Sequence, residues 1–298
     1  MADPLPIRRV LVTGASGNLG RKLIAHLAET EWCEGIVGVD RTPGAAPHTE
    51  RVSLVVGDLL DPDDRLWRDA LGTVQAVVHL ASANPAPDSS WTEACQSIDM
   101  TAYLLAAAAQ AGVRRLVFAS SNHVMGQYKD PPLADEIGPG GLRTDLPPGP
   151  GTRWFNGERM MQGTAYAVSK LMGERLCMSA ARMSAGAFTT VSLRIGWCQP
   201  GDNRPETITA SGVADAPLRA DSHPDGDRNL RWFRSMWLSN RDYVALVERA
   251  ILAPAEGWPA PGIVVNGMSA NAGMGWDIET TRRLIGYEAQ DNIGQHLS

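Results

Sequence analysis

The 298-residue sequence has few cysteines, no excess of positive charge and no long apolar run, and each absence removes a class of protein. Its four cysteines form no CxxC motif and no pairing with histidine at metal-ligand spacing, which argues against structural zinc and for free thiols in a reducing cytoplasm. Lysine and arginine number 27 against 33 acidic residues, so no general basic field is available to hold nucleic acid or an anionic membrane. No apolar run is long enough to cross a bilayer, and the first residues lack the charged and apolar regions of a secretion signal. The sequence therefore predicts a cytoplasmic protein that binds no metal, nucleic acid or membrane.

Apolar, β-branched runs alternate with helix-like stretches through the first two-thirds of the chain. The expected strands are residues 7–13, 35–40, 52–56, 74–80, 113–120 and 189–195. These runs are continuously apolar, which is typical of parallel strands covered on both faces. Helices are expected between them, most clearly over residues 93–111 and 164–183. This order predicts an α/β protein with a Rossmann-type, doubly wound parallel sheet.

The last third of the chain predicts additional elements around this sheet. They are a helix over residues 241–252, a strand over 262–266 and a final helix near 276–284. We interpret residues 1–298 as a single Rossmann-like domain, with 1–196 mainly a cofactor-binding core and 197–298 mainly a small substrate lobe. Two segments, 131–151 and 201–228, are rich in proline, glycine or polar residues and predict long loops near the site.

A glycine-rich string, Gly14-Ala15-Ser16-Gly17-Asn18-Leu19-Gly20, lies between the first expected strand and a helix-like segment. In that context glycines let the backbone approach a pyrophosphate, while the helix N-terminus offers unpaired N–H groups. Asp40 ends the second expected strand, where a carboxylate accepts hydrogen bonds from an adenosine ribose and favours NAD over NADP. Arg41 follows it and would suit a 2′-phosphate, so NADP remains the alternative.

Tyr166 and Lys170 are spaced four residues apart and fall on one face of an expected helix. A nearby ammonium lowers the pKa of a phenol, which makes phenolate available as a base. Either string alone also fits a surface turn or a solvated helix face. The two strings in this order predict a protein that binds a dinucleotide and moves a proton.

The chain resembles the extended short-chain dehydrogenases/reductases, a family that also contains sugar-nucleotide epimerases and dehydratases. The resemblance covers nearly the whole chain and rests on the two strings above and on Gly57-Asp58-Leu59, His79-Leu80-Ala81-Ser82 and Ser120-Ser121. Residues 119–126, 193–198, 229–231 and 269–271 are most similar to uronate dehydrogenases, which oxidise the anomeric carbon of a hexuronate to an aldonolactone.

The resemblance implies a role for each matched residue. Ser121 would hydrogen-bond the reacting oxygen, Tyr166 would take the proton, and Lys170 would bind the nicotinamide ribose and lower the pKa of Tyr166. Arg231 would bind the substrate carboxylate through two parallel hydrogen bonds, with Arg234 as its rival. Asn84, Asn122 and His123 would line the sugar pocket. The cofactor site would contain Tyr166, Lys170 and the residues Gly14, Ser16, Gly17, Asn18, Leu19, Gly20, Asp40, Asp58, Leu59, Leu80, Ala81, Ser82 and Ile195.

Several positions keep a second interpretation. Ser97 stands where the family commonly has an asparagine, which puts a water relay there in doubt. His123 and, more strongly, His79 also fit core histidines, since a lone histidine is weak evidence for a ligand. The residues Trp232, Trp237 and Trp276 fit either sugar stacking or the core of the lobe.

The predicted function is NAD-dependent oxidation of a galacturonate- or glucuronate-type hexuronic acid at C1 to the aldonolactone. The alternative is a nucleotide-sugar epimerase or dehydratase, or another sugar dehydrogenase of the same family. The predicted partners are a small sugar acid and a second copy of the chain. Helices 93–111 and 164–183 would pair about a two-fold axis, giving a homodimer or a higher homo-oligomer.

Overall fold

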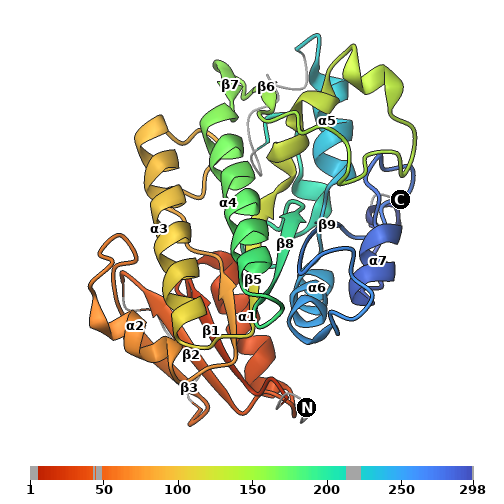
Figure 1. Cartoon of the computed structure of the whole chain (residues 1–298). Helices are drawn as coiled ribbons and strands as arrows, with labels where there is room; N and C mark the ends of the chain where they lie inside the picture. Colours follow the sequence, from red (N-terminus) through yellow and green to blue (C-terminus); the bar gives the residue numbers. More distant parts are fainter. Residues whose placement is uncertain (1–5, 43, 45–48, 213–222, 297–298) are drawn as a thin grey trace.

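The computed structural model describes residues 6–42, 44, 49–212 and 223–296. Its centre is a seven-stranded, all-parallel sheet in the order β3-β2-β1-β4-β5-β8-β9 (Figure 1). The strands of this sheet are β1 (Arg9–Thr13), β2 (Gly35–Asp40), β3 (Val52–Val56), β4 (Ala76–His79), β5 (Arg115–Ser121), β8 (Thr189–Ile195) and β9 (Gly262–Gly267). The strand order reverses between β1 and β4, and a doubly wound sheet binds ligands beyond the carboxyl ends of its strands at such a reversal.

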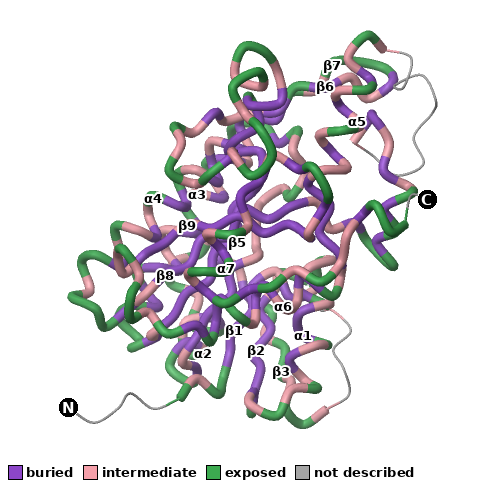
Figure 2. Tube along the Cα trace, turned by 90° about the vertical axis from the view of Figure 1, so that its right-hand side faces the viewer, coloured by how far each residue is buried: buried purple, intermediate pink, exposed green. Residues whose placement is uncertain are grey.

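Helices cover both faces of the sheet, so its strands are buried on both sides except at the β3 edge, where Leu54 and Val56 are exposed (Figure 2). Val10 and Val12 of β1 pack on the face covered by α1 (Asn18–Glu29), α6 (Asn240–Leu252) and α7 (Glu279–Ile285). Leu11 packs on the opposite face, under α2 (Arg65–Leu71), α3 (Trp91–Gln110) and α4 (Thr164–Met183). The expected doubly wound Rossmann-type fold is therefore confirmed, and the continuous apolar runs reflect this two-sided burial.

The observed bounds follow the expected ones closely in this core. Strands β2, β3 and β8 and helix α4 begin and end where the sequence predicts, and the other expected elements agree to within a few residues. Part of the expected C-terminal lobe belongs to the main sheet, because β9 pairs in parallel with β8 and α6 packs beside α1 in the core.

A third apolar cluster lies beyond the carboxyl ends of the strands. It joins the 3-10 helix η1 (Asn122–Lys129), the hairpin β6 (Arg153–Phe155) and β7 (Met160–Gln162), and helix α5 (Gly226–Ser235). Figure 1 shows β6, β7 and α5 together at the end of the molecule away from α2. The expected loop at residues 131–151 contains the short 3-10 helix η2 (Leu133–Glu136) and leads into this hairpin.

Two sequence expectations fall partly outside the described residues. Residues 213–222 of the expected polar loop 201–228 belong to the undescribed part, as do residues 1–5 at the N-terminus. In the portion of the chain that the structure does describe, no helix combines the length and the apolar character needed to span a bilayer.

Candidate active site

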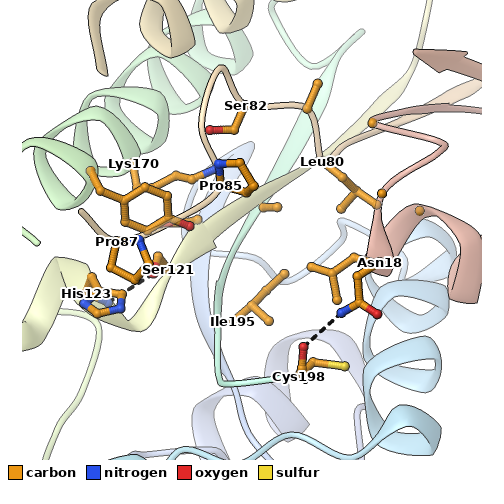
Figure 3. A pocket seen from close by; sticks show the side chains of 18 of the residues that line it. Asn18, Leu80, Ser82, Pro85, Pro87, Ser121, His123, Lys170, Ile195 and Cys198 are labelled. Atoms are coloured by element: carbon orange, nitrogen blue, oxygen red, sulfur yellow. Dashed lines mark hydrogen bonds between the residues drawn. The ribbon is translucent and has the colours of Figure 1, made fainter. Parts of the chain in front are cut away.

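A cavity of about 470 Å³ runs along the carboxyl ends of the strands, from the glycine-rich turn to the third apolar cluster. Figure 3 shows Asn18, Leu80 and Cys198 on one side of it and Lys170, Ser121 and His123 on the other. The residues of the expected cofactor site that line it are Gly14, Gly17, Asn18, Leu19, Gly20, Asp40, Asp58, Leu59, Leu80, Ala81, Ser82, Tyr166, Lys170 and Ile195. Residues distant in sequence thus converge on one cavity. After the roles predicted from the sequence, we call the part along residues 14–20, 40 and 57–59 the nucleotide half and the part beside His123, Trp154, Trp197 and Phe233 the substrate half.

The glycine-rich turn makes a backbone cradle that side chains would fill. Gly14 adopts a φ of 68°, in the left-handed region that favours glycine, and a Cβ there would lie 2.9 Å from the amide nitrogen of Ala81. A Cβ on Gly20 would lie 2.2 Å from the carbonyl oxygen of Gly14. Gly17 caps α1 without a side-chain hydrogen bond, so the first N–H groups of this twelve-residue helix remain free for an anion. The turn therefore fits the pyrophosphate of a dinucleotide.

Asp40 holds the adenosine end of the turn in shape. Its carboxylate accepts hydrogen bonds from the amide of Ser16 at 2.9 Å and from the amide of Thr42 at 3.2 Å. Ser16 itself donates its hydroxyl to the carbonyl of Thr42 and does not line the cavity, so its contribution to the site is the shape of the turn. Arg41 is exposed and also lines the cavity beside Asp40.

Ser121, Tyr166 and Lys170 come together in the middle of the cavity. Ser121 is the last residue of β5, and the other two lie one turn apart on α4. The Lys170 ammonium lies 5.5 Å from the centre of the Tyr166 ring. Although the ring lines the open cavity, burial of the phenol raises the pKa of Tyr166 to about 12, and a hydrogen bond with Ser121 acts in the opposite direction. Burial lowers the pKa of Lys170 to about 8, because the ammonium close to the phenol has lost water and its charged form is disfavoured.

A buried ion pair fixes the strands and the helix that carry these groups. The Glu174 carboxylate accepts two hydrogen bonds from the Arg194 guanidinium, at 2.8 and 2.9 Å, and a third from the Ser120 hydroxyl at 2.6 Å. Glu174 follows Lys170 by one helical turn, and Ser120 precedes Ser121. Helix α4 is therefore tied to β5 and β8 immediately behind the reacting groups.

His123 and Asn122 line the substrate half through η1, as the resemblance implies. The Nδ1 atom of His123 lies 2.7 Å from the Thr152 hydroxyl, and its ring meets the Tyr166 ring edge-on at 5.7 Å. Burial lowers the pKa of His123 to about 4, so the imidazole is neutral at pH 7. Asn122 donates its amide to the Ile195 carbonyl at 3.1 Å, which ties η1 to the end of β8.

Ser82 and Asn84 lie on the loop that follows β4. Ser82 lines the cavity, and its hydroxyl donates to the carbonyl of Asn84 at 2.9 Å and lies 3.2 Å from the hydroxyl of Ser97. Asn84 does not line the cavity, because its amide donates to Glu93 and its side-chain oxygen accepts from the Ala86 amide. In this chain Ser97 supports the loop, accepting a hydrogen bond from the amide of Ala83 at 3.1 Å.

The structure does not place Arg231 in the cavity, against the expectation that it contacts the substrate. The inward face of α5 carries Asn229 and Phe233, one turn apart and both buried. Arg231 lies midway between them in sequence, so it points to the opposite side of the helix and is exposed. Arg234 is half-buried and likewise does not line the cavity.

Sequence reasoning missed an aromatic wall in the substrate half. Trp154 of β6, Trp197 after β8 and Phe233 of α5 line the cavity together with Met236, Pro85 and Pro87. The tryptophans singled out in the sequence are elsewhere: Trp237 and Trp276 are buried in the third cluster, and Trp232 packs on Trp276 with ring centres 5.3 Å apart. The sequence could have indicated Trp197 by its position, because it lies two residues beyond the carboxyl end of a buried strand, where ligands bind in this fold.

The chain matches known proteins over most of its length. Residues 10–198 match the NAD dependent epimerase/dehydratase family. L-arabinose 1-dehydrogenase (NAD(P)(+)) of Haloferax volcanii is 32% identical over 95% of this chain and 97% of its own length. The chain belongs to the NAD-dependent epimerase/dehydratase family. The resemblance to the extended short-chain dehydrogenases/reductases is thereby confirmed. The protein is an NAD-dependent enzyme of the dehydrogenase type, as predicted.

Other members of the family show the same likeness over most of their length. Uronate dehydrogenase of Agrobacterium fabrum is 30% identical, over 96% of this chain and 86% of the relative. The solved structure of a mutated uronate dehydrogenase superposes with a TM-score of 0.66 at 26% identity, covering 97% of this chain and 84% of the other. A short-chain dehydrogenase/reductase superfamily protein from Agrobacterium tumefaciens with bound NAD has the same fold, with a TM-score of 0.67. Family membership thus shows NAD-dependent chemistry, while these relatives are named for different sugar substrates.

Proposed function

We propose that this protein oxidises the C1 hydroxyl of a cyclic sugar to the corresponding lactone, with NAD as the oxidant. The observation that carries the proposal is the convergence of Ser121, Tyr166 and Lys170 at the junction between the nucleotide half and the substrate half of one cavity. Relatives named as sugar dehydrogenases, which match over nearly the whole chain, support a sugar as the substrate.

Each side chain has a task that follows from its position. The Tyr166 phenolate removes the proton of the C1 hydroxyl, and the Ser121 hydroxyl donates a hydrogen bond to the same oxygen as its C–O bond becomes a carbonyl. Burial raises the pKa of Tyr166, and the Lys170 cation near the phenol, together with the Ser121 hydrogen bond, opposes this rise in favour of the phenolate form. NAD, when bound along Gly14–Gly20 and Asp40, supplies the acceptor for the hydride that leaves C1.

The hexuronate version of this reaction has support from the relatives named uronate dehydrogenase. It requires a partner for the C6 carboxylate, and the expected partner Arg231 is exposed outside the cavity. Oxidation of a hexuronate to the aldonolactone is therefore the second candidate. With Arg228 paired and Arg231 exposed, Arg234 is the arginine of α5 left to bind the carboxylate.

The test is a set of purified sugars incubated with the full-length protein and NAD, followed by absorbance of NADH and by chromatography of the product. Stoichiometric NADH and lactone support C1 oxidation. A nucleotide-sugar epimerase or dehydratase would instead convert a UDP-sugar without net NADH, and that result would replace the proposal. Two accompanying predictions, a cytoplasmic location and a homodimer or larger homo-oligomer, are checked by fractionation and by light scattering.

A further inference from the structure

The substrate half of the cavity is walled by aromatic rings, and we propose that it selects an uncharged sugar, whose C–H face lies on these rings. This inference rests on the proposed function and names the substrate class of the same site. It predicts that sugars carrying a carboxylate or a phosphate at the end remote from C1 are poor substrates. The hexuronate candidate is therefore the one that this inference opposes.

The rings form a continuous series that begins at the reacting phenol. His123 meets Tyr166 at 5.7 Å between ring centres and meets Trp154 at 6.1 Å. Phe233 then contacts Trp154 edge-on at 6.0 Å and Trp197 at 5.6 Å. Because all five rings line the cavity, a ring-shaped substrate with C1 at Tyr166 has this series along its length.

The polar edge of Trp154 is already used within the protein, which leaves the carbon surface of this ring for the ligand. Trp154 donates its indole N–H to the Ser211 carbonyl at 2.7 Å. Gly212 also lines the cavity and packs tightly against two of these rings, since a Cβ there would lie 3.1 Å from both Phe233 and Trp154. Aromatic faces of this kind bind the apolar face of a ligand and offer no compensation for a stripped ionic charge.

Among the described residues, no cation belongs to the wall formed by Trp154, Trp197 and Phe233, and the half-buried Arg234 beside Phe233 does not line the cavity. Among the described residues that line the cavity, the cations are Arg41, at the adenosine end, and Lys170, beside the phenol. Lys129, at the far side of η1, is bound to Asp130 at 2.7 Å and to the side chain of Asn229 at 2.8 Å. Arg228 pairs with Asp225 and Asp130.

His123 supplies no cation either, because burial keeps the pKa of its imidazole near 4. A carboxylate pressed against these rings would lose water and gain no ionic partner from the described wall, which is unfavourable. A hydroxymethyl group or a hydrogen at the same position carries no such cost. The wall therefore discriminates by charge rather than by sugar shape alone.

The decisive experiment compares sugars that differ in one group, using the full-length protein at saturating NAD. L-arabinose, galactose and galacturonate share a ring and carry hydrogen, hydroxymethyl or carboxylate, while glucose 6-phosphate adds a phosphate to glucose. We expect kcat/KM for the best neutral sugar to exceed that for its charged counterpart by at least about a hundredfold, the scale on which an unpaired buried charge is rejected. A uronate that equals or exceeds its neutral counterpart overturns the inference and leaves the proposed function intact. No NADH from any sugar removes the proposed function and the inference with it.

Substitution of the wall tests the placement of the sugar. Trp197→Ala should raise KM for the neutral sugar about tenfold through the lost ring contact, with little change in KM for NAD. Trp197→Arg should narrow the ratio between the neutral sugar and the uronate, because it adds the missing cation. Trp91→Ala is the matched control, since Trp91 is 60% exposed on α3 and does not line the cavity. If both Trp197 variants bind NAD normally but leave the sugar KM and the charge ratio unchanged, the sugar does not lie on this wall.

Discussion

The two halves of the cavity are built from different materials. The nucleotide half consists of strand ends and of backbone close to Gly14, Gly17 and Gly20, where a side chain would collide with neighbouring backbone at two of the three positions. The substrate half consists of side chains from η1, β6 and α5, held by a cluster of its own. A site made of backbone is specified by where side chains are forbidden, whereas a site made of side chains is specified by which ones are present. The first kind leaves a string that can be identified in sequence, and the second does not.

The largest effect is expected where the two halves meet. Tyr166→Phe removes only the phenol oxygen, so we expect turnover to fall by roughly a hundred- to ten-thousand-fold, the usual cost of losing a general base. NAD affinity should remain nearly unchanged, because the glycine turn and Asp40 hold the cofactor. Steady-state kinetics and NAD titration by fluorescence measure the two quantities. A variant that keeps more than a tenth of the activity shows that another group takes the proton.

The backbone character of the nucleotide half is tested by adding one methyl group. In Gly20→Ala the new Cβ would lie 2.2 Å from the Gly14 carbonyl oxygen, so the turn must open. Overpacking of this kind costs about 1 to 3 kcal/mol, which corresponds to roughly five- to a hundredfold weaker NAD binding. Gly72→Ala is the control, because its Cβ meets its nearest neighbour at an ordinary 3.5 Å. Equal NAD affinity in both variants would mean that the cradle is not tight.

Asp40 tests whether one side chain sets selectivity within the backbone-built half. Asp40→Ala should narrow the preference for NAD over NADP by about tenfold, because a charged hydrogen bond to the ribose and repulsion of a 2′-phosphate are lost together. The ratio of kcat/KM for the two cofactors is the measurement, with the exposed, non-lining Asp88→Ala as control. A wild-type protein that works better with NADP at equal concentration contradicts the assignment.

Two buried histidines affect stability and not cofactor or substrate selection: His123 lines the substrate half, whereas His79 ends β4 beside Thr13 and does not line the cavity. Burial lowers the pKa of His79 to about 3 and that of His123 to about 4, below the value near 6.5 of an unfolded chain. Protonation therefore favours the unfolded state, so the stabilisation is complete above about pH 6.5 and is lost as the pH falls toward 4. Each histidine should add about 1.4 kcal/mol per pH unit to the slope of unfolding free energy in that window.

Urea unfolding from pH 7 to pH 4 measures this slope. His79→Gln and His123→Gln should each lower the slope by the contribution of the histidine that is replaced. A slope that neither substitution changes would show that the acid sensitivity arises from other groups. A change in the slope from one variant alone would assign the acid sensitivity to that histidine.

The sequence predicted the parallel core well, for a physical reason, and the residues predicted to bind the cofactor, apart from Ser16, line one cavity. Strands such as β2 and β8 are buried on both faces, so every residue contributes to the apolar signal and the ends are sharp. Helix α4 was equally clear, and it placed Tyr166 and Lys170 in the described cavity.

The substrate half was harder to predict because its elements are short and weakly patterned. Helix α5 was not expected, since its ten residues contain few apolar side chains among four charged ones. Without the helix, the direction of Arg231 was unconstrained, and the inward positions Asn229 and Phe233 gave no local signal. Trp154 lies in a hairpin of two three-residue strands, which is too short for periodicity to show.

The buried ion pair of Glu174 and Arg194 aligns Tyr166 with Ser121 when the protein folds. It joins α4 to β5 and β8 within one turn of Lys170, where loss of either partner would leave a buried charge uncompensated at a cost of about 3 to 5 kcal/mol. The helix that carries the phenol is thus fastened by the fold itself to the strand that carries Ser121. The entropic cost of aligning these two groups is met during folding rather than at each turnover. In the proposed reaction, Tyr166 and Ser121 are therefore aligned before NAD and the sugar bind.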